Sequence, residues 1–357
     1  MGSSDGKTFV MAGGGSGGHV IPSLAVAQEL RTRGHNCVFI GTRTGFEARL
    51  VPAANFPIEY IEIGGLKRVG LARVVRTLAQ LPLGILKVRA LLKTIRPAAI
   101  FSMGGYAAGP VVLAGWSMRI PIIVMEPNAM PGFTNRWIGR VVSRALLNFP
   151  EAARFFPKGR SEVTGLPVRA EFFDIPPKRR EQKITILITG GSQGSRTLNN
   201  AARGSWQFFK DANFPVRFIH QAGKNTHEEI AKEFAQTGLE GEVLPFIEDM
   251  PAAFAQADIV VCRSGAGAMA ELAAAGKPSI LVPLPTAADN HQLHNAQAFE
   301  RAGAARLVLD SEFDGRRLFD EINSLTPAQL EAMSEKARTF AHPGAARRAA
   351  DLMESAT

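Results

Sequence analysis

Short apolar runs rich in β-branched residues alternate with helix-like segments along the chain, and this alternation limits its fold more than any other feature. Eight runs have the length of a buried strand: 8–12, 37–41, 98–102, 120–125, 184–189, 216–220, 258–262 and 279–282. Segments with helical spacing of apolar residues follow or separate them: 21–33, 106–118, 196–211, 267–275, 289–302 and 327–341. Strands that are apolar throughout and separated by helices predict an α/β fold with parallel sheets covered on both faces.

The pattern starts a second time in the middle of the chain. A strand that leads into a glycine-rich turn occupies 8–18, and the same arrangement returns at 184–194. Because 357 residues are enough for two domains, we expect two Rossmann-like domains of similar size that face each other across a cleft. In such sheets ligands bind beyond the carboxyl ends of the strands, at turns that lead into helices.

Charge is distributed unevenly along the chain. Residues 1–180 contain 24 Lys and Arg against 10 Asp and Glu, a net charge of +14, whereas the remainder carries −5. No acidic residue stands between Glu62 and Glu126, an interval with nine basic residues. A one-sided basic surface indicates an anionic partner: nucleic acid, acidic lipid or a phosphorylated substrate. Aromatic residues do not alternate with these charges, which disfavours single-stranded nucleic acid.

The segment 66–96 is both basic and rich in leucine. Its apolar residues recur at helical spacing up to Leu81, and Pro82 and Gly84 are expected to separate this helix from a second one. A basic amphipathic pair of this kind can rest on an anionic bilayer, or its apolar face can simply pack on the first domain. The side chains predicted to face a membrane are Leu78, Leu81, Ile85, Lys87 and Arg89.

No segment is expected to cross a membrane. The uncharged stretch 97–118 has the length of a span, but four glycines and a proline interrupt it and its start reads as a strand. The apolar run 9–12 is too short for the core of a signal peptide. Cys37 and Cys262 stand far apart in apolar runs, so we expect two buried thiols and no zinc site.

The first glycine-rich turn carries a weak nucleotide signal. Gly13, Gly15 and Gly18 fit G-x-G-x-x-G, but Gly-Thr-Arg at 41–43 replaces the acid expected after the next strand. The turn therefore indicates either an anion site at backbone N–H groups or a tight turn that serves packing alone. His19 follows directly, and its imidazole can accept a proton from a substrate hydroxyl, cap the helix or orient a ligand.

Small and polar residues also gather at helix starts in the second half. Ser264 fits an N-cap, and the small residues after it let a phosphate approach the helix. Glu271 can accept hydrogen bonds from a ribose diol, although a glutamate also suits this helix N-terminus. The polar run 289–295, like Asn128 and Arg169 in their loops, suits either ligand recognition or local capping.

Together these motifs resemble the MurG family, the bacterial N-acetylglucosaminyltransferases that convert lipid I to lipid II in peptidoglycan synthesis. The matching segments follow the family order over nearly the whole chain: GGSGGH at 14–19, MGGY at 103–106, GP at 109–110, EPN at 126–128, GLPVR at 165–169, GGSQGS at 190–195, FI at 246–247, RSGA at 263–266, Glu271, Gln292 and Asn295. The ordered set, rather than any single motif, makes the resemblance specific.

The resemblance implies a GT-B fold and an inverting transfer of N-acetylglucosamine (GlcNAc) from UDP-GlcNAc to the 4-hydroxyl of the muramyl sugar in lipid I. It implies an acceptor- and membrane-facing domain at 1–165 and a UDP-GlcNAc-binding domain at 166–343. A C-terminal helix, 344–357, is expected to pack back on the first domain. The enzyme is then expected to be peripheral at the cytoplasmic face of the inner membrane, with a role in cell-wall biogenesis, cell shape and cell division.

The same resemblance assigns roles to individual residues. His19 is the catalytic base. The residues assigned to UDP-GlcNAc are Ser16, Gly17, Gly18, Asn128, Arg169, Ser192, Ile247, Ala266, Gly267, Ala268, Met269, Glu271 and Gln292. Those assigned to the acceptor diphosphate are Gly104, Gly105 and Tyr106. No cofactor and no metal ion are implied, because no D-x-D-type acid pair stands near the donor segments.

Some positions depart from the family, and other classes of protein stay open. Pro127 and His291 stand where family members often have glutamine, and Leu166 where asparagine is usual. A UDP-GlcNAc 2-epimerase shares the fold but needs no lipid, and another GT-B enzyme can use a different lipid acceptor. An NAD(P) dehydrogenase needs a ribose acid or a 2′-phosphate site near Arg43, and a nucleic-acid-binding protein would use the basic half.

Overall fold

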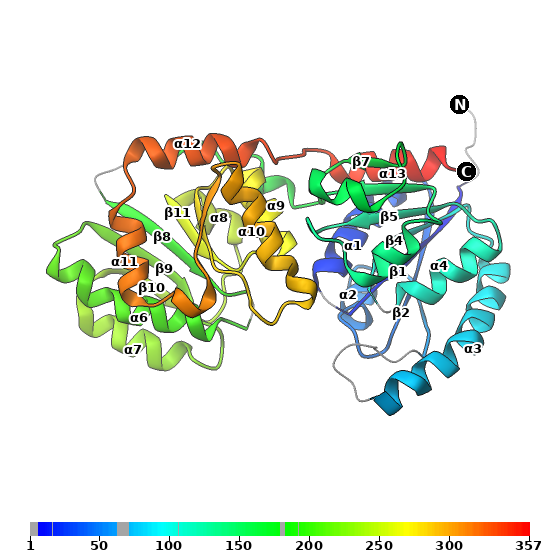
Figure 1. Cartoon of the computed structure of the whole chain (residues 1–357), viewed down its shortest axis with the longest axis horizontal. Helices are drawn as coiled ribbons and strands as arrows, with labels where there is room; N and C mark the ends of the chain where they lie inside the picture. The colour runs from blue at the N-terminus through cyan, green and yellow to red at the C-terminus, as the bar shows by residue number, and fades with distance from the viewer. Residues whose placement is uncertain (1–5, 16, 63–70, 106, 179–182, 192) are drawn as a thin grey trace. The chain divides into compact units, whose positions relative to one another are not determined.

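The computed structural model describes residues 6–15, 17–62, 71–105, 107–178, 183–191 and 193–357, with only the backbone for 71–81. The chain divides into two compact units (Figure 1): Met1–Pro167 with Gly344–Thr357 forms the first, and Val168–Pro343 forms the second. Each unit contains a parallel β-sheet flanked by helices, so the predicted α/β class is confirmed.

The first unit contains a seven-stranded parallel sheet in the order β3-β2-β1-β4-β5-β6-β7. Its strands are β1 (Thr8–Gly13), β2 (Asn36–Gly41), β3 (Ile58–Tyr60), β4 (Ala99–Gly104), β5 (Ile122–Glu126), β6 (Arg144–Leu147) and β7 (Ser161–Val163). Every residue of β4 and β5 is buried, as expected for strands covered on both faces. The strand order reverses between β1 and β4, so the turns after these two strands lie at the edge where such sheets bind ligands.

The helices of the first unit are α1 (Gly17–Thr32), α2 (Glu47–Ala53), α3 (Leu71–Ile95), α4 (Ala108–Ser117), α5 (Phe133–Ile138) and α13 (Ala345–Ser355), with a 3-10 helix η1 (Pro150–Phe155). Helix α13 packs on α1. Arg33, just after α1, joins the two helices: its guanidinium lies 2.7 Å from a carboxylate oxygen of both Asp351 and Glu354. Glu354 also contacts His35 at 2.7 Å. The end of the chain therefore completes the first unit.

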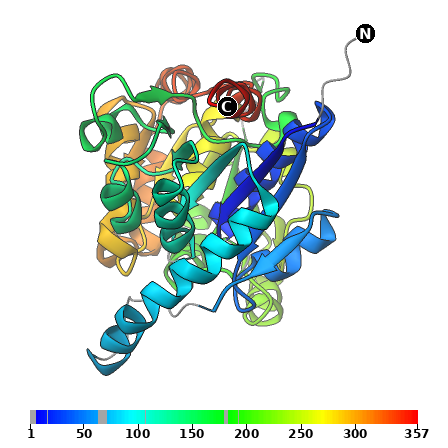
Figure 2. The ribbon, with the colours of Figure 1, turned by 90° about the vertical axis from the view of Figure 1, so that its right-hand side faces the viewer.

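Helix α3 is continuous over 25 residues (Figure 2), so the prediction of a break at Pro82 is wrong. A proline inside a helix removes one backbone hydrogen bond and crowds the preceding turn. Pro82 is exposed, so water can hydrate the carbonyl group that loses its partner. The second half of α3 packs against α4, and its Val88 and Leu92 are fully buried. This packing anchors the half of the helix that follows the proline.

The second unit contains a six-stranded parallel sheet in the order β10-β9-β8-β11-β12-β13. Its strands are β8 (Ile184–Thr189), β9 (Val216–Gln221), β10 (Glu240–Leu244), β11 (Ile259–Cys262), β12 (Ser279–Leu281) and β13 (Ala305–Leu307). Its helices are α6 (Arg196–Asp211), α7 (His227–Thr237), α8 (Met250–Gln256), α9 (Ala266–Ala275), α10 (His291–Arg301), α11 (Gly315–Asn323) and α12 (Pro327–Arg338). Short 3-10 helices η2 (Ala170–Phe172), η3 (Ala288–Asn290) and η4 (Asp310–Glu312) complete it.

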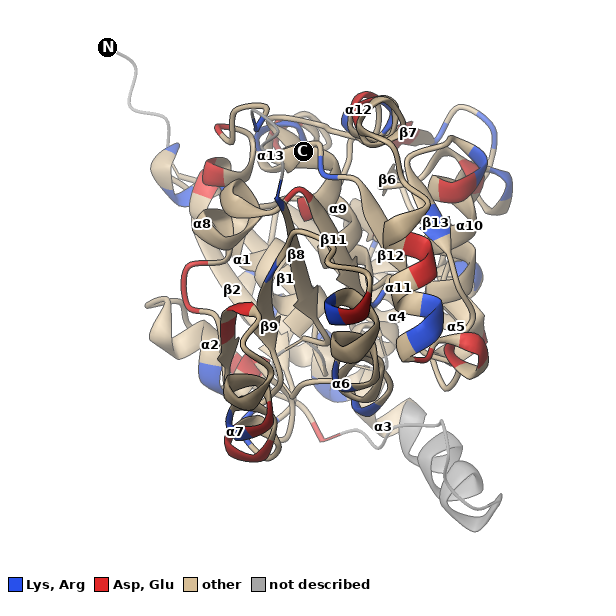
Figure 3. Cartoon of the chain, turned by 90° about the vertical axis from the view of Figure 1, so that its left-hand side faces the viewer, with Lys and Arg blue, Asp and Glu red and all other residues tan. Residues whose placement is uncertain are grey.

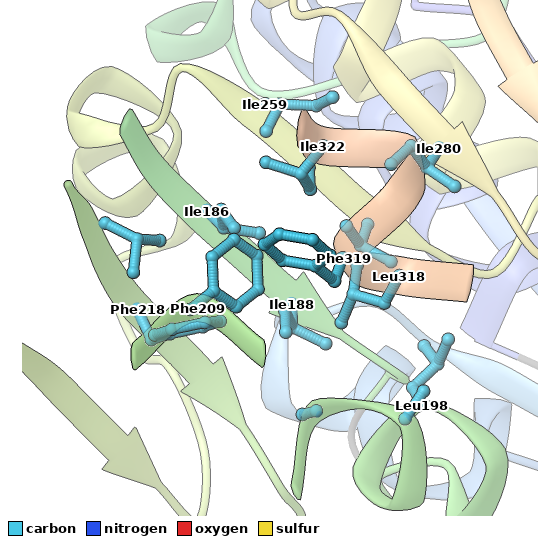
Figure 4. Close-up of a cluster of buried hydrophobic side chains, with 14 of the residues drawn as sticks. Ile186, Ile188, Leu198, Phe209, Phe218, Ile259, Ile280, Leu318, Phe319 and Ile322 are labelled. Atoms are coloured by element: carbon cyan, nitrogen blue, oxygen red, sulfur yellow. The ribbon is translucent and has the colours of Figure 1, made fainter. Parts of the chain in front are cut away.

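An aromatic cluster fills the core of the second unit (Figure 4). Phe209 of α6 lies at its centre, with its ring centroid 5.0 Å from that of Phe319 in α11 and 5.4 Å from that of Phe218 in β9. Edge-to-face pairs of this kind add stability beyond the apolar area that they bury. The outer surface of this unit carries much of the chain's acidic charge, for example on α7 (Figure 3).

The sequence also predicts that no segment crosses a membrane and that both cysteines are buried thiols. Among the described helices, none combines the length and hydropathy that a bilayer crossing needs. Cys37 in β2 and Cys262 in β11 are free and buried, as predicted. Burial raises the pKa of each thiol to about 12, which keeps both in the unreactive protonated form at neutral pH.

Candidate active site

A single buried carboxylate organises the first glycine turn. Glu47, the first residue of α2, is only 1% exposed and lies against the turn after β1. Its Oε2 accepts a hydrogen bond from the backbone N–H of Gly15 at 2.8 Å. Its Oε1 accepts two from Thr42, from the backbone N–H at 2.9 Å and from the hydroxyl at 2.8 Å. A Cβ on Gly14 or Gly41 would overlap with this carboxyl group, so the glycines leave the space that it fills.

The protonation state of Glu47 follows from these contacts. Burial alone would raise the pKa of its carboxyl group, but the backbone hydrogen bonds from Gly15 and Thr42 hold that pKa below its ordinary value. Glu47 is therefore ionised at neutral pH. It brings a negative charge to a turn where the sequence pattern indicated a site for an anion.

His19 lies in the first turn of α1, next to the same glycine turn. Its Nδ1 is 3.3 Å from the carbonyl oxygen of Gly14. Because a carbonyl oxygen can only accept, Nδ1 is the nitrogen that carries the proton in this contact. Gly105, which follows β4 with φ +82°, comes close to both groups, and a Cβ there would touch the Gly14 oxygen and the imidazole ring.

A second buried carboxylate holds the loop after β5. Glu126 accepts hydrogen bonds from the backbone N–H groups of Asn128 at 2.9 Å and Gly132 at 3.3 Å, and from the Asn135 amide at 2.8 Å. Burial raises the pKa of Glu126 to about 7, although each of these hydrogen bonds lowers it. The side chain of Asn135 also fills the space beside Gly104, where a Cβ would overlap with it.

The second unit repeats the glycine turn with different neighbours. Gln221, at the end of β9, donates from Nε2 to the carbonyl oxygen of Gly191 at 2.9 Å. Its Oε1 lies 3.3 Å from the hydroxyl of Thr189, at the end of β8. Gly194 has φ +73° and packs against the Ala222 carbonyl, so a Cβ would not fit there. Amide groups, rather than a carboxylate, hold this turn in place.

Arg263 connects the ends of four strands in the second unit. It follows β11 and donates to the hydroxyl of Ser195, which is the N-cap of α6 after β8, at 2.8 Å. It also donates to the carbonyl oxygen of Val282, after β12, at 3.0 Å. Its ion pair with Asp310, after β13, has an N–O distance of 2.5 Å. One guanidinium therefore fixes the loops at the edge where this sheet binds ligands.

The start of α9 differs from the prediction in one respect. The N-cap is Gly265 rather than Ser264, because the Ser264 hydroxyl donates instead to the carbonyl oxygen of Gln292 at 2.8 Å. A glycine N-cap offers no side chain to the first N–H groups of the helix, which leaves them suited to a phosphate. Asn295 is buried and donates to the Ser264 carbonyl at 3.1 Å, so α10 braces this turn.

Glu271 lies in α9, one turn beyond its start. Burial raises the pKa of its carboxyl group to about 7, and the attraction of Arg169 lowers it. Arg169 is exposed, with its guanidinium 5.1 Å from the ring centroid of Phe172. Gln292, in α10, accepts from the backbone N–H of Leu284 at 3.0 Å. A carboxylate, a guanidinium and a helix start can together recognise a ribose and a diphosphate.

The predicted residues fall into both units. In the first unit the structure places Gly17, Gly18 and His19 at the start of α1, Gly104 and Gly105 after β4, and Asn128 after β5. In the second unit it places Ala266, Gly267, Ala268 and Met269 in the first turn of α9, and Ile247 in the segment before α8, only 6% exposed. Ser16, Tyr106 and Ser192 lie outside the described residues, as do the side chains of Leu78 and Leu81.

The positions that depart from the family pattern have local roles. The carbonyl group of Pro127 accepts from the Asn148 amide at 3.1 Å. His291 Nδ1 lies 2.7 Å from the Ala288 carbonyl oxygen at the start of α10, and Leu166 is buried.

Sequence reasoning missed the acids and the arginine that hold the loops, Glu47, Glu126 and Arg263. Only the motif membership of Glu126 and Arg263 gave a signal. Glu47 gave no signal. An acid is expected directly after the second strand, at 41–43, whereas Glu47 lies further along the chain, at the start of helix α2.

Two family matches cover most of the chain. Residues 9–147 match the glycosyltransferase family 28 N-terminal domain, and residues 185–353 match the glycosyltransferase family 28 C-terminal domain. Two parallel-sheet α/β domains with these matches define a glycosyltransferase of the GT-B class.

Individual relatives refine this class. A transferase from Solibacter usitatus (strain Ellin6076), named UDP-N-acetylglucosamine–N-acetylmuramyl-(pentapeptide) pyrophosphoryl-undecaprenol N-acetylglucosamine transferase, is 62% identical over 97% of this chain and 95% of its own. The crystal structure of Acinetobacter baumannii MurG is similar with a TM-score of 0.85 and 32% identity, covering 98% of this chain and 99% of that one. The chain belongs to glycosyltransferase family 28, within its MurG family.

A more distant structure shares the fold alone. UDP-GlcNAc 2-epimerase from Neisseria meningitidis, bound to UDP-GlcNAc, is similar with a TM-score of 0.66 and 14% identity over 98% of this chain and 99% of that one. At this identity the likeness says nothing about the reaction.

Proposed function

We propose that this enzyme transfers GlcNAc from UDP-GlcNAc to the 4-hydroxyl of the muramyl sugar in lipid I, the undecaprenyl-diphosphate-linked MurNAc-pentapeptide. The observation that carries the proposal is 62% identity over 97% of the chain to a relative whose name states this donor and acceptor. The product, lipid II, is a precursor of peptidoglycan. The enzyme therefore serves cell-wall biogenesis, and through it cell shape and division.

The second unit binds the donor. The first turn of α9 receives the diphosphate, with Arg169 as the neighbouring cation, and Glu271 accepts hydrogen bonds from the ribose hydroxyls. Ile247 meets the uracil through its backbone, Gln292 contacts the sugar, and Ser192 completes the group. The support for this assignment is the open helix start, the nearby opposite charges and the bracing of the loops by Arg263.

The first unit binds the acceptor and supplies the base. Gly104 and Gly105, with Tyr106, receive the acceptor diphosphate; both glycines have positive φ, which brings backbone N–H groups within reach of an anion. Gly17, Gly18, Ser16 and Asn128 contact the GlcNAc being transferred. His19 Nε2 takes the proton from the 4-hydroxyl, because Nδ1 already donates to the Gly14 carbonyl group.

The transfer forms one glycosidic bond and breaks one bond to UDP. The acceptor oxygen forms a bond to the anomeric carbon as the bond from that carbon to the UDP oxygen breaks, and the configuration inverts from α to β. The hydroxyl proton goes to His19, and the electron pair of the broken bond leaves with UDP. Arg169 and the α9 helix start stabilise the departing diphosphate, without a metal ion.

The basic part of the first unit docks on an anionic membrane surface, which keeps the enzyme peripheral at the cytoplasmic face. Leu83 and Leu86 of α3 are 63% and 61% exposed. Helix α4 packs against α3, and its Trp116 is 54% exposed. Ile85, predicted to face the membrane, is instead half-buried against the core, so its two neighbours take that role. The exposed Lys87 adds positive charge.

Vesicle binding tests this surface. Replacing Leu83 and Leu86 with serine should weaken binding to vesicles rich in anionic lipid, measured by cosedimentation, while turnover of a soluble acceptor stays at the parent level. Leu309→Ser is the matched control, because Leu309 is a 43% exposed leucine of the second unit. Equal vesicle binding by the parent and the double variant would refute this surface.

The reaction is tested by release of UDP from UDP-GlcNAc in the presence of EDTA, with and without a short-chain lipid I analogue. The proposal expects release that depends on the analogue and continues in EDTA, with the disaccharide product identified by mass spectrometry. Release without the analogue would indicate an epimerase or a hydrolase. Binding of the donor without any release would show that the acceptor is wrong, and loss of release in EDTA would overturn metal independence.

A further inference from the structure

One peptide group connects Glu47 to His19. The N–H of Gly15 donates to Glu47 Oε2 at 2.8 Å, and the carbonyl oxygen of Gly14 lies 3.3 Å from His19 Nδ1. This N–H and this C=O belong to the same peptide bond, so the two hydrogen bonds stand in series. A peptide polarised by a carboxylate at its N–H end is a stronger acceptor at its C=O end.

The carboxylate in this series has a fixed position. Its second oxygen is held by both donors of Thr42, and the group is almost completely buried. A Cβ at Gly14, Gly41 or Gly45 would overlap with it, so the turn after β1 and the segment from the end of β2 to α2 are both shaped around the Glu47 carboxyl group. Because these contacts also keep the carboxyl group ionised, its charge is permanent at neutral pH.

We propose that Glu47 is the positioning residue for His19, acting through the Gly14–Gly15 peptide. The series fixes the imidazole as the Nδ1–H tautomer and leaves the lone pair on Nε2. When Nε2 takes the acceptor proton, the negative charge at the far end of the peptide stabilises the imidazolium. A carboxylate does this by direct contact in hydrolase triads; here one peptide group stands between the two side chains.

The same arrangement disfavours a nucleotide diphosphate at the Gly15 N–H of the first glycine turn. The Gly15 N–H, which faces the pyrophosphate in a dinucleotide-binding turn, is already used by a carboxylate. A phosphate there would meet the buried charge of Glu47 at close range. Glu47 follows the position where a ribose-binding acid is expected, but it has a different task, which is to position His19.

The inference rests on the proposed role of His19, and Glu47→Gln in the full-length chain tests it. A glutamine removes the negative charge in either orientation: with its NH₂ group toward Gly15 the hydrogen bond is broken, and with its oxygen toward Gly15 the acceptor is neutral and polarises the peptide less. We expect kcat to fall by about tenfold or more, since a positioning group is lost. The Kd for UDP, which the second unit binds, should stay unchanged in a calorimetric titration.

A spectroscopic measurement separates positioning from a merely structural role. Nitrogen-15 chemical shifts of the imidazole report the tautomer, and a spectrum of His19→Gln identifies the His19 signals among the seven histidines. The parent should show the Nδ1–H tautomer above the imidazole pKa, and Glu47→Gln should show a mixture. Glu162→Gln is the matched control: it changes a carboxylate of the first unit that pairs with Arg348 rather than with the glycine turn, and it should keep both the tautomer and kcat.

The outcomes are distinct. An Nε2–H tautomer in the parent overturns the inference, and this needs no variant to fold. A Glu47→Gln enzyme with the parental tautomer also overturns it, whatever its kcat. If the tautomer shifts as expected but His19→Ala keeps its turnover, Glu47 still orients the ring, while the proposed role of His19 as base fails.

Discussion

The two glycine turns have the same place in the two units, after the first strand of each sheet, but opposite electrostatic surroundings. In the first unit a buried, ionised Glu47 takes the Gly15 N–H. In the second unit an amide from Gln221 holds the Gly191 carbonyl group, and the guanidinium of Arg263 holds the following N-cap. The first turn is therefore suited to supporting a cation such as imidazolium, and the second to receiving an anion.

The difference shows that a glycine-rich turn does not identify its ligand. The turn supplies N–H groups and space, and the side chains brought in from other elements decide which charge is favoured there. In this enzyme those side chains come from α2 in one unit, and from the end of β9 and the loop after β11 in the other.

The largest effect is expected at the first turn. Replacing His19 with alanine should lower kcat by about 10² to 10⁴-fold, the usual contribution of a general base, with the Kd for UDP unchanged. Steady-state turnover of the lipid I analogue and a calorimetric UDP titration measure the two quantities. Turnover within a few-fold of the parent would show that His19 is not the essential base. The negative charge at the first turn would then have no role in proton transfer.

A smaller effect is expected when the second turn loses its guanidinium. Arg263→Ala leaves Asp310 and the Ser195 hydroxyl without this partner, so unfolding free energy should fall by about 3 kcal/mol and UDP should bind less tightly. Arg316→Ala is the control, because the Arg316–Asp320 pair is exposed and its loss should leave the unfolding free energy almost unchanged. Equal destabilisation by the two changes, in denaturant titrations, would contradict the role given to Arg263.

The smallest effect concerns pH. Burial raises the pKa of Glu271 to about 7, so this carboxyl group gains a proton as the pH falls through 7 and can no longer accept from both ribose hydroxyls. The Kd for UDP should therefore rise by up to about tenfold for each unit below pH 7. Glu271→Gln should bind weakly at every pH, with a flatter profile. A parental Kd that is constant between pH 8 and 6 would exclude Glu271 as the ribose ligand.

Long, fully buried elements could be predicted from sequence, and short or half-exposed ones could not. Strand β8 and helix α6 have the predicted bounds, because a run of four apolar residues and two threonines, and a strong helical periodicity, leave little choice. Strands β3, β7 and β13 have three residues each and are partly exposed, so they produce no pattern. A proline inside a helical pattern predicts a break, so the continuity of α3 across Pro82 could not be predicted from the local sequence.

The candidate site divides in the same way. His19 and Glu271 could be found because they stand next to glycine turns that mark strand ends. Glu47 could not, because an acid at the start of a helix usually faces solvent and favours the helix dipole. Its burial depends on glycines at 14, 41 and 45, which come together only when β1, β2 and α2 pack. Contacts of this kind belong to the tertiary structure.

The pairing of α13 with α1 has a consequence for how the chain is made. Helix α1, which carries His19, receives a covering layer from residues 345–355, with Met353 fully buried. On the ribosome these residues emerge after the whole second unit. The second unit can therefore finish folding during synthesis, whereas the first unit, which carries His19, is complete only once α13 has been made and has packed on α1.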